Sequence, residues 1–376
     1  MIIKDLEVFP LSLPMKQSFQ ISGGTVGDSN QGAPHVYVKI ISEDGFEGWG
    51  EARPSHRWSY ETIETVVSTI QKYIKPVILG KKADDLSTIH EMIDKEISSG
   101  FSKGQPICKA AVDMALYDLI GKSSNKSLSE VWLGKSKKHI DLSYLISTRN
   151  LEEAAKKAKY ASENGYKAVD VKIGFNVGFD MEVLETVKAE APSLFFRVDA
   201  NQGYTLPEAI KAAKKMEKIG VDVFEQPLKA NDLLGHRELR RKTSLPIALD
   251  ESIWSPSDVL QAIRLEACDY AVIKLTKMGG ITGAKLAGEL AKEANLGLLG
   301  GGLTESSLGL TSSAHLFNYL GIHLPSDLNG PFFLADDPIQ NSGEIEMGSI
   351  LLPSGYGIGC EVDPKKLETY KIQVQV

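Results

Sequence analysis

The sequence predicts an α/β protein that combines a small N-terminal α+β domain with a TIM-like barrel of eight parallel strands. At 376 residues, the chain exceeds the size at which one hydrophobic core keeps growing. The first hundred residues show strand patterns followed by helical patterns, which is the order of an α+β domain. From His139 onward, short apolar runs alternate with amphipathic helical segments at a period of roughly 25 residues, as in a barrel. We therefore expect residues 1–125, completed by the tail 348–376, to form the first domain and residues 126–347 to form the barrel.

The N-terminal part begins with a predicted hairpin. Two β-rich runs, HVYVKIIS and FEGWGEA, flank the turn Glu43-Asp44-Gly45. Residues 60–97 then carry isoleucine, valine and leucine at helical spacing. A further segment, 109–122, has apolar residues three and four apart and ends near Gly121, which we interpret as its C-cap.

The barrel strands are predicted from short apolar runs separated by helix starts. Thr205 and Ser255 each precede an early proline, and Asp258 follows Ser255 at capping-box spacing. A doubly wound open sheet is the competing fold, but no GxGxxG motif follows a strand. The predicted strands are 140–146, 168–173, 194–199, 221–225, 247–250, 269–275, 296–300 and a weak last strand near Ile322.

Composition narrows the classes of function. The chain is 42% hydrophobic and 24% charged, with a net charge of −7, which is typical of a globular protein and gives no basic field to hold nucleic acid or an anionic membrane. The three cysteines are far apart, so neither a disulfide framework nor a zinc site is indicated. The first residues lack the apolar run of a signal peptide, and no stretch is long enough to cross a bilayer. We expect a cytoplasmic homo-oligomer that acts on a small carboxylate.

Three acidic residues end three consecutive predicted strands: Asp199 in FFRVDANQG, Glu225 in DVFEQP and Asp250 in PIALDES. They lie one strand-helix repeat apart, so they belong to neighbouring strands whose carboxyl ends meet where barrel enzymes place their chemistry. A single acid at a strand end is more often a helix cap or an ion-pair partner, but three in succession favour a shared cation. An all-oxygen shell with open positions suits Mg²⁺, with Mn²⁺ as a substitute, better than zinc.

Two lysines complete this set. Lys172 ends the second predicted strand, in AVDVKIG, and Lys274 ends the sixth, in YAVIKLTKMGG. Strands two and six face each other across an eight-stranded barrel, so a bound substrate would lie between two amines. A lysine after a strand can be an ordinary surface residue, but that interpretation is weak for Lys274, which lies within an apolar run. Burial and a nearby cation both lower a lysine pKa, so we expect both side chains to act as general bases near neutral pH.

A metal beside two lysines indicates removal of a proton from the carbon next to a carboxylate. The enediolate that forms carries two negative oxygens, and a bound cation stabilises that charge where it develops. A lysine base combined with Mg²⁺ is the known solution in the enolase superfamily.

The motifs closely resemble those of the enolase superfamily and, within it, the muconate lactonizing enzyme subgroup, which includes dipeptide epimerases, N-succinylamino acid racemases, o-succinylbenzoate synthases and cycloisomerases. The resemblance covers nearly the whole chain and is carried by GWGEA, DANQG, EQP, ALDES, IKLTKMGG, ESSLG and DLNGPFFLADDP. It implies a (β/α)7β barrel, with Asp199, Glu225 and Asp250 as magnesium ligands. It further implies that Lys172 and Lys274 are the acid/base pair.

The same resemblance implies where a substrate would be held. Loops of the first domain near residues 22–30 and 53–58 would cover the barrel mouth. Polar side chains near the two lysines would contact the substrate: Asp170, Asn201, Glu305, Asp327 and Asn329.

Two positions depart from the family pattern. The family usually has lysine-x-lysine on strand two, whereas this chain has Asp170 ahead of Lys172. We expect Asp170 either to pair with Lys172 and raise its pKa or to turn aside into a helix contact. The second departure is the segment DLNGP beginning at Asp327, where dipeptide epimerases use Asp-x-Asp to hold a substrate ammonium and only the first acid remains. Cycloisomerases also carry an acid, a non-acid two residues later and then Gly-Pro.

The leading hypothesis is racemisation or epimerisation of an amino-acid derivative, including a dipeptide. Two opposed lysines suit exchange of a proton across a planar intermediate, and Asp327 could neutralise a substrate ammonium. The first alternative is cycloisomerisation of a muconate-like dicarboxylate by one lysine, and the second is dehydration of a hydroxy acid or hydroxyproline-like compound. A non-catalytic barrel with a structural metal is disfavoured because it would not explain two lysines that face each other.

Overall fold

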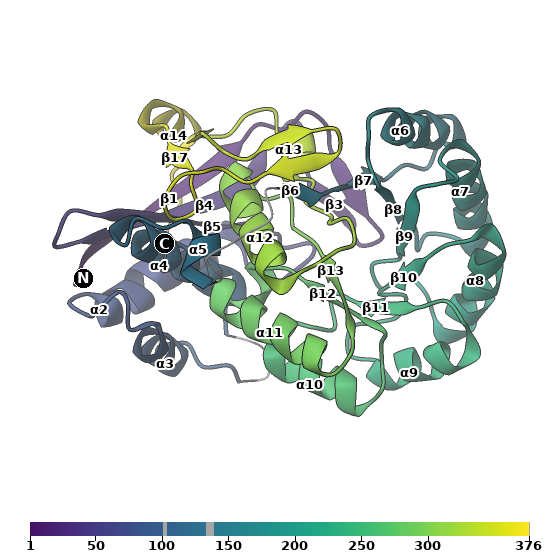
Figure 1. The fold of residues 1–376 in the computed structure, drawn as a ribbon, viewed down its shortest axis with the longest axis horizontal. Helices are drawn as coiled ribbons and strands as arrows, with labels where there is room; N and C mark the ends of the chain where they lie inside the picture. The colour runs from purple at the N-terminus through teal and green to yellow at the C-terminus, as the bar shows by residue number, and fades with distance from the viewer. Residues whose placement is uncertain (101–103, 133–138, 376) are drawn as a thin grey trace.

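The computed structural model describes residues 1–100, 104–132 and 139–375, and it contains two parts that lie side by side (Figure 1). The N-terminal strands and the first helices form one part. Within the described residues, a curved parallel sheet of seven strands with helices along its outer side forms the other part. No helix of these residues is long and apolar enough to span a membrane.

The N-terminal part is built on an antiparallel sheet. Its strands, together with those of a separate short hairpin, are β1 (Ile3–Leu13), β2 (Phe19–Ile21), β3 (Gly24–Gly27), β4 (Ala33–Ser42) and β5 (Glu47–Ala52). The predicted hairpin is confirmed, since β4 pairs antiparallel with β5 and β1 joins the other edge of β4. The long helix α4 (Pro106–Ser123) lies on β5 because two glycines leave room for it. A Cβ atom at Gly48 or Gly50 would lie 2.1 or 2.0 Å from a carbonyl oxygen of that helix.

The helices after the hairpin occupy the predicted region, with one correction. They are α1 (Ile63–Thr69), a π-helical turn η1 (Ile70–Ile74), α2 (Lys75–Ile78), α3 (Leu86–Glu96), α4 and α5 (Leu128–Trp132). The expected C-cap at Gly121 is wrong, because α4 continues to Ser123. Gly121 instead permits a close contact, since a Cβ atom there would lie 2.5 Å from the Cα atom of Gly357 in the tail.

The curved sheet follows the predicted order of strands. Neighbours in the sheet are consecutive in the chain and parallel: β7 (Ser143–Ile146), β8 (Ala168–Lys172), β9 (Phe195–Asp199), β10 (Val223–Glu225), β11 (Ile247–Leu249), β12 (Tyr270–Ile273) and β13 (Gly297–Gly300). The first predicted strand is divided, because β6 (His139–Asp141) pairs with a strand of the tail instead.

The eighth strand predicted near Ile322 is wrong. Gly321 has a φ of 69° and ends α12 (Ser307–Leu320), and the amide of Ile322 bonds back to a carbonyl of that helix. Ile322 is therefore the apolar residue that follows a helix cap. The ring of strands is closed instead by bridges from Ser326 to the β7 side and from Asp327 to the β13 side.

The interior of the barrel places alternate side chains of the strands toward the axis. An apolar layer is formed by Val223, Ala248, Val272 and Leu299. Because side chains alternate along a strand, the residues two positions further on also face inward, at the carboxyl ends. These include Glu225, Asp250 and Lys274.

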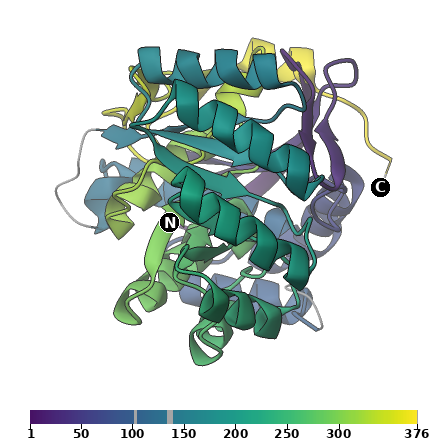
Figure 2. The same ribbon diagram turned by 90° about the vertical axis from the view of Figure 1, so that its right-hand side faces the viewer.

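Helices cover the outer side of the sheet in an arc, which Figure 2 shows facing the viewer. They are α6 (Leu151–Glu163), α7 (Val177–Glu190), α8 (Leu206–Ile219), α9 (Leu233–Lys242), α10 (Pro256–Arg264), α11 (Ile281–Glu293) and α12. The 3₁₀ turn η2 (Thr276–Met278) follows β12 and is buried. The predicted helix starts are confirmed: Thr205 forms a capping box with Glu208, and the Ser255 side chain accepts from the Asp258 amide.

The segment after α12 contacts both parts of the molecule. Its elements are α13 (Gly330–Phe333), β14 (Ile339–Gln340), β15 (Glu344–Glu346), and, in the tail, β16 (Ser349–Leu351), β17 (Glu361–Val362) and α14 (Pro364–Tyr370). β16 pairs with β6 next to the barrel. Beyond α14, the amide of Ile372 donates to the Pro10 carbonyl in β1, so the end of the chain lies against the N-terminal sheet (Figure 1).

Candidate active site

A pocket lies at the carboxyl ends of the barrel strands, under the N-terminal part. Its polar lining from the barrel consists of Lys172, Asn201, Lys274, Thr304, Asp327 and Asn329. The N-terminal part adds Phe19, Ile21, Val26, Ser55 and Trp58. Val26, Ser55 and Trp58 belong to the two loops expected to cover the barrel mouth, so that prediction is confirmed.

Strand register positions Lys172. It is the last residue of β8 and lies opposite Asp199, the last residue of β9. The Nζ atom of Lys172 donates to a carboxylate oxygen of Asp199 at 2.7 Å. The same Nζ atom lies 3.7 Å from an oxygen of Asp170 and 3.6 Å from one of Asp327. Asp170 shares this side because it stands two residues before Lys172 on the same strand.

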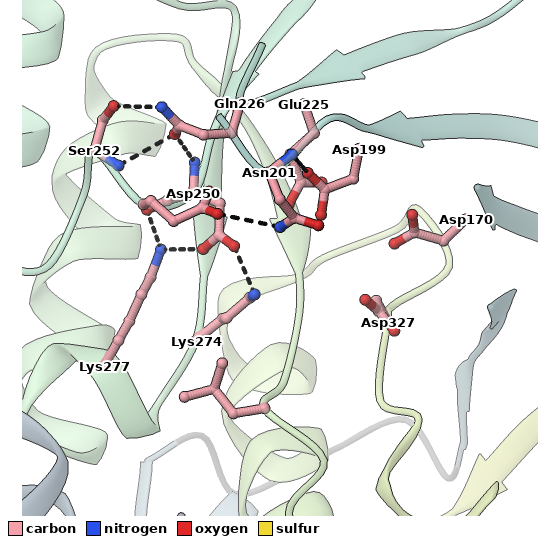
Figure 3. A network of polar contacts seen from close by, with 12 residues as sticks. Asp170, Asp199, Asn201, Glu225, Gln226, Asp250, Ser252, Lys274, Lys277 and Asp327 are labelled. Atoms are coloured by element: carbon pink, nitrogen blue, oxygen red, sulfur yellow. Dashed lines mark hydrogen bonds and ion pairs between the residues drawn. The ribbon is translucent and has the colours of Figure 1, made fainter. Parts of the chain in front are cut away.

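Lys274 has different neighbours. Its Nζ atom donates to the Oδ2 atom of Asp250 at 2.6 Å. Lys277 donates to the Oδ1 atom and to the backbone oxygen of Asp250, both at 2.6 Å, so two buried lysines share one aspartate (Figure 3). The Nζ atom of Lys274 also lies 5.1 Å from the centre of the Trp58 ring, which stacks on Trp254 with a centroid distance of 5.0 Å.

Glu225 lies between these two settings. It stands opposite Asp199 in the sheet, and its carboxylate accepts a hydrogen bond from the Nε atom of Arg197. The same Nε atom lies 3.5 Å from Asp170. Burial raises the pKa of Glu225 to about 7, although Arg197 opposes the rise. Burial also raises the pKa of Asp170 to about 7 against the opposing charges of Lys172 and Arg197.

The expected lowering of both lysine pKa values is wrong for this arrangement. Burial lowers the pKa of Lys172, but Asp170 and further carboxylates outweigh it, and the pKa is raised well above its usual value. For Lys274, burial also lowers the pKa, but carboxylates outweigh this effect, with Asp250 the strongest, so this pKa is raised as well. Of the two expectations for Asp170, the structure therefore agrees with the first, a charge that faces Lys172 and raises its pKa. The pKa of Lys277 is lowered, because burial dominates there.

Two family models match the chain. One, described as mandelate racemase / muconate lactonizing enzyme, N-terminal domain, matches residues 5–134, and the other, described as enolase C-terminal domain-like, matches residues 152–366. The chain belongs to the muconate lactonizing enzyme subgroup of the enolase superfamily.

Members of the subgroup with several activities are similar to this chain. An L-Ala-D/L-Glu epimerase from Clostridium acetobutylicum is 32% identical over 96% of this chain and 99% of the relative. The structure of a dipeptide epimerase from Enterococcus faecalis V583, complexed with Mg and the dipeptide L-Leu-L-Tyr, is 27% identical, with a TM-score of 0.90 over 96% of this chain and 100% of that one. The muconate lactonizing enzyme from Pseudomonas putida is 26% identical, with a TM-score of 0.91 over 99% of this chain and 100% of that one.

The enolase superfamily implies a magnesium ion, and the carboxylates at the ends of β9, β10 and β11 fit such an ion. Asp199, Glu225 and Asp250 are fully buried, and the Oε1 atom of Glu225 accepts no hydrogen bond from any described residue. Among all the residues that the structure describes, no three acidic, histidine or cysteine side chains lie close enough together to form a ligand set. Each of the three carboxylates is instead paired with a lysine or an arginine. All the atoms that these side chains could offer a metal are oxygens, and one of them, the Oε1 atom of Glu225, is buried and unused by the described residues. Such a set suits a hard divalent cation.

The residues predicted to contact substrate divide into two groups. Asn201, Asp327 and Asn329 line the pocket. Asp170 and Glu305 are buried behind its wall. The carboxylate of Glu305 accepts hydrogen bonds from a threonine hydroxyl at 2.7 Å and from a backbone amide of the pocket-lining loop at 2.6 Å, so it holds that loop.

Three residues of the site were not singled out from the sequence. Arg197 stands two residues before Asp199 in an apolar strand, and this spacing could have shown that it faces inward. Glu251 follows Asp250 directly, and its pKa is raised to about 8 by burial and by that neighbouring charge. Lys277 lies in the η2 turn, where no periodic pattern indicates the direction of a side chain.

Proposed function

We propose that this chain transfers a proton at the carbon next to a substrate carboxylate and that it racemises or epimerises an amino-acid derivative, including a dipeptide. One observation carries the proposal: Lys172 and Lys274 line the same pocket from β8 and β12, with three strands between them on the sheet. Two amines on opposite sides of a planar intermediate can take a proton from one face and return one to the other. The similarity to an L-Ala-D/L-Glu epimerase supports this class of reaction.

Each lysine exchanges the α-proton at its Nζ atom. A lysine that donates to Asp199 or Asp250 is held as an ammonium group and can deliver a proton. A lysine that accepts a proton must be neutral, with its nitrogen lone pair directed at the α-proton, and its remaining N–H groups can still donate to the carboxylate. Apolar side chains around the two amines limit the access of water, which would otherwise compete for the proton: Phe19, Ile21, Val26, Leu145, Leu303 and Phe333.

Asp199, Glu225 and Asp250 would hold the magnesium ion. When bound, this ion supplies positive charge to the oxygens of the substrate carboxylate, where negative charge develops. The Oε1 atom of Glu225 is unused by the described residues, whereas Asp199 accepts from Lys172 and Asp250 accepts from Lys274 and Lys277. The ion would therefore share Asp199 and Asp250 with the lysines.

The proposal is tested by exchange of the α-proton in deuterated water. The protein is incubated with magnesium and a panel of dipeptides, N-acyl amino acids, betaines and dicarboxylates, and exchange and inversion are followed by NMR and chiral chromatography. We expect exchange with inversion for amino-acid derivatives, and loss of both on chelation with recovery on adding Mg²⁺ or Mn²⁺. Absence of exchange across the whole panel would refute the proposal.

Cycloisomerisation of a dicarboxylate is the second candidate, supported by the similarity to the Pseudomonas putida enzyme. Asp327→Asn separates the two, since Asp327 lines the pocket within 3.6 Å of Lys172. For an enzyme of amino-acid derivatives, losing this carboxylate should lower kcat/KM for cationic substrates by about a hundredfold. For a cycloisomerase, the same change should leave the turnover of a dicarboxylate unchanged or improve it. The two results are mutually exclusive in one substrate panel.

A further inference from the structure

The Lys172 side of the pocket holds buried oxygen atoms without donors. Both carboxylate oxygens of Asp170 are buried, and no donor in the described part of the chain reaches them. The side-chain oxygens of Asn201 and Asn329, two residues of the pocket wall, are buried and lack donors in the same way. Because a buried acceptor without a donor is costly, the two asparagine oxygens of the pocket wall suit a ligand that brings hydrogen-bond donors, whereas Asp170 lies outside the pocket lining.

The same side carries more negative than positive charge. Among the described residues, four carboxylates surround the two cations Lys172 and Arg197 there. Each cation donates to the carboxylate that ends the next strand, Lys172 to Asp199 and Arg197 to Glu225. The other two, Asp170 and Asp327, stand only within ion-pair distance, at 3.5 to 3.7 Å. Figure 3 shows these two beside each other, away from Lys274 and Lys277.

We infer that Asp170 determines specificity, by making the pocket select a substrate with a free, positively charged ammonium group over one whose nitrogen is acylated. This inference rests on the proposed function and adds a substrate class to it. Asp170 is fully buried behind Lys172, so it acts through its charge and not through contact. It offsets the charges of Lys172 and Arg197, and the carboxylate of Asp327 at the pocket wall is thereby left for the substrate. In a water-poor site, charges a few ångströms apart interact far more strongly than in bulk water.

A set of three substrates that differ only at the amine tests the inference. One dipeptide is supplied with a free amine, as its N-acetyl form and as its N-succinyl form, and α-proton exchange is measured in deuterated water with magnesium, at a pH above the pKa of about 7 of Asp170. Asp170→Asn removes the charge and keeps the shape, and Asp170→Lys reverses the charge. The ratio of kcat/KM for the free over the N-acetyl form should fall about tenfold or more in Asp170→Asn, mainly through KM of the free amine. It should fall further in Asp170→Lys, with the N-succinyl form preferred.

Asp327→Asn is the matched control, because it removes a charge at the pocket wall itself and should lower the same ratio. An Asp170→Asn protein that loses activity equally on all three substrates would show a structural role only and overturn the inference. Wild-type protein that exchanges the acylated forms faster than the free amine would also overturn it, while the proposed function stands.

The experiment remains decisive in two further cases. If circular dichroism shows that Asp170→Asn does not fold, Asp170→Ser is measured in its place, where the same fall in the ratio of the free over the N-acetyl form is expected and an unchanged ratio overturns the inference. No exchange with any of the three, together with exchange on an unrelated member of the wider panel, overturns the inference alone. If no member of the whole panel shows α-proton exchange, the proposed function is refuted, and the inference that rests on it is refuted as well.

Discussion

The two lysines of the pocket lie in different electrostatic settings. Lys172 is surrounded by carboxylates from β8, from β9 and from the segment that closes the barrel. Lys274 shares one aspartate with Lys277 and lies beneath the Trp58 ring of the N-terminal part. Two amines of identical chemistry therefore need not be equivalent as acid and base. Strand register fixes the surroundings of Lys172, whereas those of Lys274 depend also on a loop of the other domain.

Removing either amine should have the largest effect. Lys172→Ala and Lys274→Ala should each lower the rate of inversion by about 10²- to 10⁴-fold, since a positioned general base or acid contributes that much. Each variant should still exchange the α-proton of one enantiomer with deuterated solvent, and the two variants should prefer opposite enantiomers. Chiral chromatography and NMR measure the two quantities on the same samples.

The comparison fails if either variant interconverts enantiomers at the wild-type rate, because one amine cannot reach both faces of a planar intermediate. A cycloisomerase behaves differently: it needs one proton on one face, so one variant should be inactive and the other only impaired.

The aspartates that hold the two lysines should differ in their effect on stability. Asp250→Asn leaves Lys274 and Lys277 buried without their shared carboxylate, and we expect it to lower the free energy of unfolding by about 3–5 kcal/mol. Asp199→Asn should lower it by only about 1–3 kcal/mol, because Lys172 keeps Asp170 and Asp327 nearby. Urea unfolding in the presence of a chelator measures both. Equal losses would mean that the surplus carboxylates do not stabilise Lys172.

Much of the barrel and of its charged centre could be predicted from the sequence, because each element leaves a periodic signal. The charged residues of the site end apolar runs at the spacing of a strand-helix repeat, and a parallel sheet aligns such ends. These residues are Lys172, Asp199, Glu225, Asp250 and Lys274. The closure of the ring left no such signal. The ring closes through isolated β-bridges at Ser326 and Asp327. Ile322, the apolar residue that resembled part of a strand, follows a helix cap.

The charge states could not be predicted, since they depend on distances between strands. Burial alone gives a lowered lysine pKa, and the sequence does not show that carboxylates stand 2.6 to 2.7 Å from both amines. The lysine pair on Asp250 depends on the η2 turn, which folds Lys277 back onto the end of β11. The position of Trp58 depends on how the two domains pack, which no local pattern gives.

The smallest expected effect concerns Trp58 and tests whether the N-terminal domain acts on Lys274 alone. The Trp58 ring lies 5.1 Å from the Nζ atom of Lys274, and a cation over an indole face gains about 0.5–2 kcal/mol. Trp58→Leu keeps an apolar side chain and removes that face, so exchange of the enantiomer that Lys274 serves should fall by roughly 2- to 30-fold. Exchange of the enantiomer that Lys172 serves should change by less than about twofold.

Trp58 should also affect the pH dependence of exchange. An indole face favours the ammonium form of Lys274, so its loss lowers the pKa of that amine. The pH at which the enantiomer served by Lys274 begins to exchange should therefore fall, and the corresponding pH for the enantiomer served by Lys172 should stay unchanged. Trp254→Leu is the control, because Trp254 stacks on Trp58 without itself covering the amine. If Trp58→Leu slows both directions equally and shifts neither profile, Trp58 only shapes the pocket, and the contrast between the two lysines arises within the barrel.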